Sequence, residues 1–175
     1  MSWKQALLRT YSRYLKNCLR VLDLGTGFSE NLSLLFQALV PESTVFSVDP
    51  DEAALKNAGE LFREQVSKGR LKLFRAKAEA LPFPSDFFDA VSAVHTFHHI
   101  GDKVAAFREL LRVIRPGGAA IILDWTPLGG SHIHPKGLLE KSMRETLRLA
   151  GRLLKVVERR LEREYYLIVA SSPHV

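Results

Sequence analysis

Hydrophobic and polar positions along the chain follow two alternating patterns. Short apolar runs rich in Val, Ile, Leu and Phe are suited to strands, and between them apolar residues recur every three or four positions, as on one face of a helix. The expected strands are residues 18–24, 44–48, 71–75, 89–94 and 119–123, the expected helices are 2–17, 30–40, 51–67, 103–114 and 136–150, and a turn is expected at 115–118. Strands alternating with helices predict an α/β fold, a mostly parallel sheet with helices on both faces.

The end of the chain departs from this alternation. Two β-rich runs, residues 153–159 and 164–170, are separated by only a short charged segment. A parallel pair of strands needs a crossover of about a dozen residues or more. We therefore expect these two strands to form an antiparallel hairpin at one edge of the sheet.

A glycine turn lies between the first expected strand and the helix that follows it. The segment VLDLGTG ends the strand and places Gly25 and Gly27 in the turn. Glycine permits unusual backbone angles and lets a ligand approach the main chain closely. Asp49 ends the second strand, and a carboxylate there can accept hydrogen bonds from both hydroxyls of a ribose. These residues predict a nucleotide-type ligand at the carboxyl ends of the first two strands.

The residue at the start of the second helix bears on which ligand binds. A dinucleotide motif has a third glycine five residues after the first, and Glu30 occupies that position. A carboxylate there would repel a pyrophosphate from the helix N-terminus. S-adenosylmethionine has no phosphate, and its sulfonium and ammonium groups tolerate carboxylates such as Asp23 and Glu30. The pattern favours S-adenosylmethionine over a nicotinamide dinucleotide, although Glu30 by itself is also explained as an acid favoured by the helix dipole.

Six segments, taken together, occur in the order and spacing of one family. They are VLDLGTGFSE (21–30), VFSVDP (45–50), AEALPFPSDFFDAV (78–91), HHIGD (98–102), ELLRVIRPGG (109–118) and ILDW (122–125). The chain resembles the class I S-adenosylmethionine-dependent methyltransferases, in particular the small branch similar to the ubiquinone/menaquinone-biosynthesis C-methyltransferases. The resemblance implies a Rossmann-like, doubly wound fold and an enzyme that uses S-adenosylmethionine and releases S-adenosylhomocysteine.

The same resemblance implies the cofactor contacts. The glycine turn, with Asp23 before it, is expected to line the methionine portion, Asp49 to hold the ribose, and Ala78 and Glu79 to lie against the adenine. The expected cofactor-binding residues are Asp23, Gly25, Thr26, Gly27, Asp49, Pro50, Ala78, Glu79 and His95. Lys77 departs from the family, which often has an acid there to accept a hydrogen bond from the adenine amino group. Lysine only donates, so Glu79, a backbone carbonyl or packing would have to serve instead.

Five of the six histidines lie between positions 95 and 134, in segments expected at the carboxyl ends of the fourth and fifth strands. Near neutral pH an imidazole can act as a base, a donor or a metal ligand. The candidate catalytic residues are His95, His98 and Asp124, and the candidate substrate-binding residues are His132 and Trp125. Packing, loop shaping, solvation or turn capping would also explain these side chains. We expect no metal site, because no carboxylate or cysteine spacing supports one.

The residues around the expected site narrow the classes of methyl acceptor. The tetrapeptide AVHT at 93–96 stands where an Asn-Pro-Pro-Tyr motif would indicate methylation of exocyclic amines, and no cysteine lies nearby for a covalent mechanism. We therefore expect a small-molecule acceptor. The formal net charge of +6 is concentrated near both ends, which keeps RNA or protein as an alternative acceptor. A non-catalytic cofactor-binding partner subunit is a further alternative, and Glu30 disfavours a nicotinamide-dependent oxidoreductase.

We expect residues 1–175 to form one domain in three parts. These are an N-terminal helix (1–17), a cofactor-binding core (18–126) and a substrate-side loop, helix and edge hairpin (127–175). The N-terminal helix has one apolar face, which is suited to a lid over the acceptor or to permanent core. A membrane-surface role is a third, weaker alternative, because the helix is short and has few large apolar residues. The chain shows no membrane-spanning run or secretory signal pattern and has Cys18 as its only cysteine, so we expect a cytoplasmic protein without stable membrane insertion.

Overall fold

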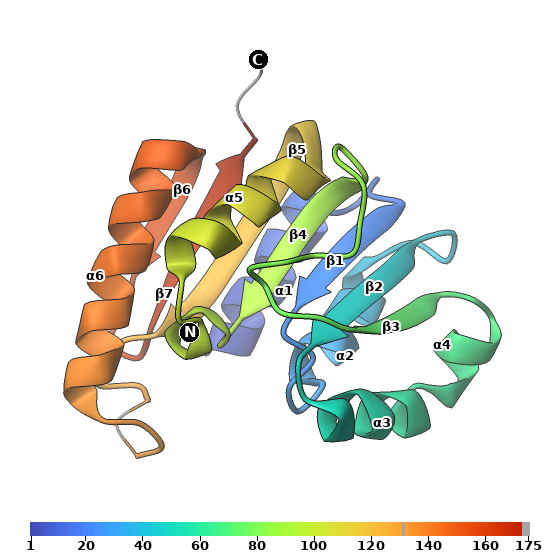
Figure 1. The fold of residues 1–175 in the computed structure, drawn as a ribbon, viewed down its shortest axis with the longest axis horizontal. Helices are drawn as coiled ribbons and strands as arrows, with labels where there is room; N and C mark the ends of the chain where they lie inside the picture. Colours follow the sequence, from blue (N-terminus) through green and yellow to red (C-terminus); the bar gives the residue numbers. More distant parts are fainter. Residues whose placement is uncertain (131, 173–175) are drawn as a thin grey trace.

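A computed structural model describes residues 1–130 and 132–172 (Figure 1). Within these residues, one seven-stranded sheet has the order β3-β2-β1-β4-β5-β7-β6. The strands are β1 (Arg20–Leu24), β2 (Thr44–Asp49), β3 (Leu71–Arg75), β4 (Phe88–Val94), β5 (Ile114–Trp125), β6 (Lys155–Leu161) and β7 (Tyr165–Ser171). Strands β1 to β5 pair in parallel, and β7 pairs antiparallel with β5 and β6. The predicted mostly parallel sheet with a C-terminal edge hairpin is therefore confirmed.

The order of the strands reverses at β1. From β1 the chain moves outward through β2 and β3 and then returns to β4 on the other side of β1. Ligands of such sheets bind outside the carboxyl ends of the strands at this reversal. The glycine turn follows β1, so the fold places it at the expected position for a ligand site.

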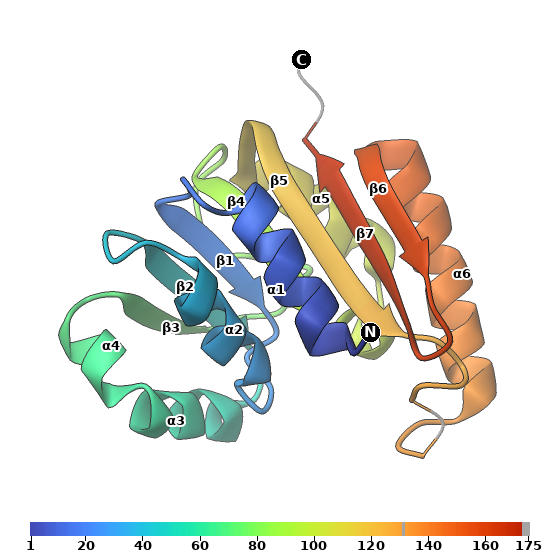
Figure 2. The same ribbon diagram turned by 180° about the vertical axis from the view of Figure 1, so that it is seen from behind.

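Helices cover both faces of the sheet (Figures 1 and 2). One face carries α1 (Trp3–Tyr14), α2 (Glu30–Ala38) and α3 (Glu52–Leu61), and the other carries α5 (Lys103–Val113) and α6 (Lys136–Leu153). Two short helices, α4 (Arg63–Ser67) and the 3₁₀ turn η1 (Phe97–His99), lie in the connections. Each face has its own hydrophobic cluster. In the described part of the chain, none of the helices combines the length and apolar character needed to cross a membrane.

The helix α1 lies along the sheet beside α2 (Figure 2). The fully buried side chains on its inner face and just after it are Ala6, Leu7, Tyr11 and Leu15. Burial on this scale is typical of core packing. Only the first turn of α1, which carries Trp3, reaches the carboxyl edge of the sheet. There Trp3 contacts His95, the residue after β4.

The prediction of a single helix over 51–67 is wrong. The structure ends α3 at Leu61 and begins α4 at Arg63, with Phe62 outside the helical region at φ −110° and ψ 35°. The ring of Phe62 packs against Phe36 of α2, with ring centroids 5.6 Å apart. This contact with the neighbouring helix is available to Phe62 at the break, and helix propensity is a weak preference that tertiary contacts can override.

The separate turn expected at 115–118 is also wrong, because these residues form a bulge inside β5. Ile114 pairs with Phe88 and Ala119 pairs with Ala90, so β5 has extra residues between these two pairs. Gly117 adopts φ +73° within the bulge, a conformation that glycine accommodates without steric cost. The remaining element boundaries agree with the sequence pattern to within a few residues.

Candidate active site

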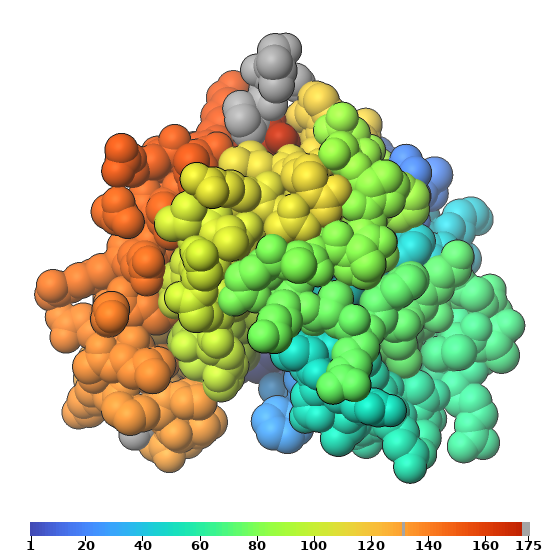
Figure 3. All heavy atoms as spheres, viewed as in Figure 1, coloured from blue at the N-terminus to red at the C-terminus, as the bar shows by residue number. Residues whose placement is uncertain are grey.

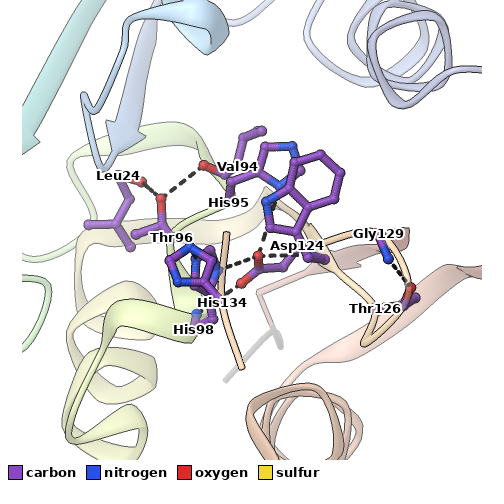
Figure 4. Close-up of polar contacts among 10 residues, drawn as sticks. Leu24, Val94, His95, Thr96, His98, Asp124, Thr126, Gly129 and His134 are labelled. Atoms are coloured by element: carbon purple, nitrogen blue, oxygen red, sulfur yellow. Dashed lines mark hydrogen bonds and ion pairs between the residues drawn. The ribbon is translucent and has the colours of Figure 1, made fainter. Parts of the chain in front are cut away.

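Hydrogen bonds to β2 and to the segment after β4 hold the glycine turn. The amides of Gly25 and Thr26 donate to the carbonyl of Val48 at 2.9 and 3.1 Å, and Thr96 Oγ1 donates to the last carbonyl of β1 at 2.8 Å (Figure 4). Both glycines have positive φ, +92° at Gly25 and +46° at Gly27. A Cβ on Gly25 would lie 2.3 Å from Thr96 Oγ1, whereas a Cβ on Gly27 would meet nothing within 4 Å. The fold itself therefore requires glycine at position 25.

Asp49 is fixed beside this turn at the carboxyl end of β2. Its Oδ2 accepts from the amide of Gly27 and its Oδ1 from the amide of Asp51, both at 2.9 Å. The side chain stays partly exposed. Because each carboxylate oxygen can accept more than one hydrogen bond, Asp49 retains acceptor capacity for a ligand.

The residues expected on the adenine side lie near the ends of β2 and β3. Pro50 follows Asp49 and is exposed, and its carbonyl accepts a hydrogen bond from Arg75 at 3.3 Å. Ala78 is buried and Glu79 is half-buried in the loop after β3, while Lys77 is exposed. Lys77 can only donate, so Glu79, a backbone carbonyl or packing would have to hold the adenine amino group. This contact stays a prediction.

Asp23 lies beneath the turn in a polar network that spans neighbouring strands. It is fully buried, and its two oxygens accept hydrogen bonds from Asn31 Nδ2 and Ser47 Oγ, both at 2.6 Å. The hydroxyl of Ser47 also lies 2.6 Å from that of Thr26 in the turn. The carboxylate that the sequence predicts against the methionine is thus bonded to protein donors, and it supports the turn from below.

The same network connects α1 to the site. The hydroxyl of Tyr11 contacts both Asn31 and Ser92, and all three are buried. In the sheet, Ser92 of β4 and Ser47 of β2 lie opposite Asp23. These partners are not among the predicted site residues, yet the sequence carries a signal for the two serines, because each interrupts the apolar middle of its strand.

We expect Asp23 to make the stability of the cofactor-free protein fall as the pH rises from about 4 to about 7. Burial raises the pKa of Asp23 to about 7, and the hydrogen bonds from Ser47 and Asn31 only partly offset this effect. Because the folded protein then binds more protons than the unfolded chain, the stabilisation is complete below the unfolded pKa and is lost as the pH rises through the folded pKa. The slope approaches about 1.4 kcal/mol per pH unit.

Urea unfolding at several pH values checks this expectation, with Asp23→Asn as the comparison. The variant should show a flatter dependence of unfolding free energy on pH, whatever its absolute stability. Equal slopes in the two proteins would show that Asp23 does not titrate in this range.

His95 lies between two tryptophans at the carboxyl end of β4. Its ring stacks on Trp125, with centroids 3.7 Å and planes 9° apart, and Trp3 meets it edge-on at 4.7 Å. The backbone of His95 is in the left-handed region at φ +52°. Both ring nitrogens are buried, and neither has a hydrogen-bond partner among the described residues; Nδ1 lies 3.9 Å from Asp124 Oδ1, beyond hydrogen-bond distance. A buried imidazole nitrogen without a hydrogen bond is costly, so this position is a candidate for a ligand contact.

His98 and Asp124 form a buried pair beside His95 (Figure 4). His98 Nδ1 lies 2.6 Å from Asp124 Oδ1, and the amide of His98 donates to Oδ2 at 2.9 Å. Burial alone would raise the pKa of Asp124, but the neighbouring imidazoles of His95 and His98 lower it to about 2. The carboxylate is therefore ionised, and Nδ1 of His98 donates to it.

Two further histidines approach this pair. His134, in the loop between β5 and α6, places its Nε2 3.2 Å from Nε2 of His98. The ring of His99 has its centroid 4.0 Å from that of His98. Burial and the nearby imidazoles lower the pKa values of His99 and His134.

The structure thus brings together four of the predicted residues, His95, His98, Asp124 and Trp125. His132 is exposed in the loop before α6. In Figure 3 the surface is hollowed at the lower centre, between the yellow-green atoms that include η1 and the teal atoms of the chain after β2. This is the edge at which the glycine turn and the strand ends meet.

Comparison with known proteins identifies the family. A family model described as a methyltransferase domain matches residues 22–122, more than half of the chain. The chain belongs to this methyltransferase family. The predicted family, with S-adenosylmethionine as methyl donor, is thereby confirmed.

The relatives of this methyltransferase agree with the fold. It is 35% identical over 108 residues to the ubiquinone/menaquinone biosynthesis C-methyltransferase UbiE of Proteus mirabilis, over 61% of this chain and 43% of that protein. The chain therefore matches less than half the length of this curated relative. A S-adenosylmethionine-dependent methyltransferase from Aquifex aeolicus has a TM-score of 0.82 at 20% identity, covering 97% of this chain and 89% of its own. The [4+2]-cyclase SpnF has a TM-score of 0.76 at 19% identity, covering 100% and 84%. These structures confirm the Rossmann-like fold.

Proposed function

We propose that this methyltransferase transfers a methyl group from S-adenosylmethionine to a small-molecule acceptor that binds against Trp3, His95 and Trp125. The observation that carries the proposal is the ring of His95, which lies between two tryptophans and whose buried nitrogens make no hydrogen bond, Nδ1 being 3.9 Å from Asp124 Oδ1. Aromatic walls with a few polar groups are typical of small-molecule sites. The imidazole would orient a polar atom of the acceptor, and the indoles would pack against its apolar part.

The residues beside this position fit the cofactor. The glycine turn exposes main chain at Gly27, and Asp49 offers a carboxylate with spare acceptor capacity for the ribose hydroxyls. Glu30 starts α2 and pairs with Lys4 at 2.6 Å, so this helix start holds a carboxylate where a dinucleotide would need room for a pyrophosphate. S-adenosylmethionine supplies a methyl group already activated on a sulfonium. The chain then has to position the acceptor and exclude water.

The N-terminal helix contributes to this site through its first turn. Trp3 covers His95, whereas the inner face of α1 is fully buried further along. We propose that the first turn moves to admit the acceptor and that the rest of α1 stays packed on the sheet. This combines the two alternatives for the helix, lid and core, in different parts of one element.

Two exposed apolar side chains, one in each of the loops after β1 and β5, support an acceptor with an apolar part. Phe28, next to the glycine turn, exposes 92% of its surface, and Ile133, in the loop before α6, exposes 61%. The UbiE relative is named for ubiquinone and menaquinone biosynthesis, which concerns small molecules. We propose that the reaction takes place in the cytoplasm, in keeping with the lone cysteine of the chain.

Methyl-labelled S-adenosylmethionine tests the proposal. The protein is incubated with label and, separately, with small-molecule, RNA and protein fractions of its host, and the label should appear in the small-molecule fraction. In the same assay, His95→Asn should lower kcat/KM by about tenfold through the loss of one hydrogen bond to the acceptor. Asparagine tolerates positive φ, so the backbone after β4 should keep its conformation in this variant. Label found only in RNA or protein would contradict a small-molecule acceptor.

A further inference from the structure

Three imidazoles converge at the carboxyl edge of β4 and β5 (Figure 4 shows two of them, His98 and His134). One ring nitrogen from each of His98, His99 and His134 lies within 4.8 Å of those of the other two. His98 and His99 come from η1, after β4, and His134 comes from the loop after β5. The pairing of β4 with β5, not local spacing along the chain, brings these rings together.

The separations approach those of a metal centre. Zinc binds imidazole nitrogen at about 2.0–2.1 Å in tetrahedral geometry, which sets neighbouring ligand nitrogens about 3.3 Å apart. The Nε2 atoms of His98 and His134 are 3.2 Å apart. The widest separation in the group, up to 4.8 Å, has to close by about 1.5 Å for a tetrahedral site. His99 is exposed and His134 is half-exposed in a loop, so rotation of their side chains can supply this movement.

Asp124 orients the central ligand. Its 2.6 Å contact with Nδ1 of His98 fixes the ring so that Nε2 faces His134. A carboxylate behind a metal-binding histidine is the usual support of such ligands. A hydrogen bond between the two rings accounts for the contact of His98 with His134, and the backbone amides of His98 and Trp125 account for the buried carboxylate of Asp124. Neither accounts for the approach of the third ring.

We propose that His98, His99 and His134 bind a divalent cation of the zinc type, which holds the oxygen or sulfur atom of the methyl acceptor. This inference rests on the proposed function. Three protein ligands with a fourth position open to substrate are typical of catalytic zinc sites, as opposed to structural ones. The sequence pattern predicts no metal because the ligands come from separate segments.

In this arrangement the cation acts on the acceptor. Coordination lowers the pKa of an acceptor hydroxyl or thiol, which releases its proton to solvent. The oxygen or sulfur lone pair then forms the bond to the methyl carbon, the carbon–sulfur bond of the sulfonium breaks, and its electron pair stays on the cofactor sulfur. The products are the methylated acceptor and S-adenosylhomocysteine. The acceptor class is therefore a small molecule with an ionisable hydroxyl or thiol.

Metal titration of the full chain tests the inference without cofactor or acceptor. After dialysis against a chelator, Zn²⁺ is followed by calorimetry and Co²⁺ by its visible absorption, which is intense in tetrahedral sites. We expect one equivalent to bind. His99→Ala and His134→Ala should each weaken binding by at least about a hundredfold, because each removes a ligand and even the loss of a supporting residue costs about 10–100-fold. His132→Ala, in the same loop as His134, should bind the metal as the wild type does.

The outcomes separate this inference from the proposed function. Absence of stoichiometric binding, or equal affinity in wild type, His99→Ala and His134→Ala, would overturn the metal site. So would methyl transfer at the wild-type rate by chelator-treated His99→Ala. The affinity for S-adenosylmethionine, measured on the metal-free protein, would still support the proposed function in each of these cases. Absence of S-adenosylmethionine binding by the metal-free wild type would count against the proposed function, and the result of the metal titration would still stand.

Discussion

Gly25→Ala is expected to destabilise the protein by about 2–5 kcal/mol, beyond the effect of Gly27→Ala. Positive φ costs a residue with a side chain about 1–2 kcal/mol, and this term applies to both glycines. At Gly25 alone the new methyl group would meet Thr96 Oγ1 at 2.3 Å. Thr96 would have to leave the carbonyls of Leu24 and Val94, which it contacts at 2.8 and 3.0 Å, and overpacking adds about 1–3 kcal/mol.

Urea unfolding of the two single variants measures this difference, and Thr96→Ala in both backgrounds identifies its cause. In the Gly25→Ala protein, removing the Thr96 hydroxyl and methyl groups should restore part of the lost stability, whereas the same change should only destabilise the wild type. In the Gly27→Ala protein, Thr96→Ala should restore no stability, because nothing lies within 4 Å of a Cβ at position 27. The coupling between positions 25 and 96 is therefore specific to Gly25. Equal losses at the two glycines, or no coupling with Thr96, would refute the packing explanation.

Asp49→Ala is expected to weaken S-adenosylmethionine binding by about ten- to a hundredfold. Hydrogen bonds to a charged acceptor contribute about 1.5–3 kcal/mol, and the ribose offers two hydroxyls to this carboxylate. The substitution also removes the acceptor for the amide of Gly27, so the turn loses its link to β2 at that point. Calorimetry on the folded variant measures the affinity, and circular dichroism confirms that the fold persists.

Asp51→Ala is the matched control for this prediction. Asp51 is also an acid near the end of β2, but its side chain caps α3 by accepting from the amide of Ala53 at 2.9 Å. Loss of this cap should cost about 1 kcal/mol of stability and change the cofactor affinity by less than about threefold. Unchanged affinity in Asp49→Ala, or an equal loss in Asp51→Ala, would show that the ribose is held elsewhere.

The elements that the sequence predicts correctly are those specified by local patterns. Alternating apolar strands and amphipathic helices indicate a parallel sheet, and the short segment before residue 164 requires an antiparallel hairpin. The proximity of the glycine turn to Asp49 follows from the same pattern, because both come directly after parallel strands and so meet at the carboxyl edge. Both features depend on neighbours in the chain, so no knowledge of tertiary contacts is needed.

The features that the sequence does not predict depend on contacts between distant segments. Asp23 is enclosed by donors from β2 and α2, which only strand register and helix packing bring into reach. His134 joins His98 across 36 positions, so no ligand spacing is visible along the chain. The break at Phe62 coincides with a ring contact with another helix. In each case a tertiary contact outweighs, or is invisible to, the local pattern.

Calorimetric titration of the wild-type chain with S-adenosylmethionine, S-adenosylhomocysteine and NAD tests the central claim most directly, namely that the glycine turn and Asp49 form a site for S-adenosylmethionine. We expect S-adenosylmethionine and S-adenosylhomocysteine each to bind at one equivalent per chain, and NAD to show no binding at the same concentrations. Binding of NAD without binding of S-adenosylmethionine would contradict the claim.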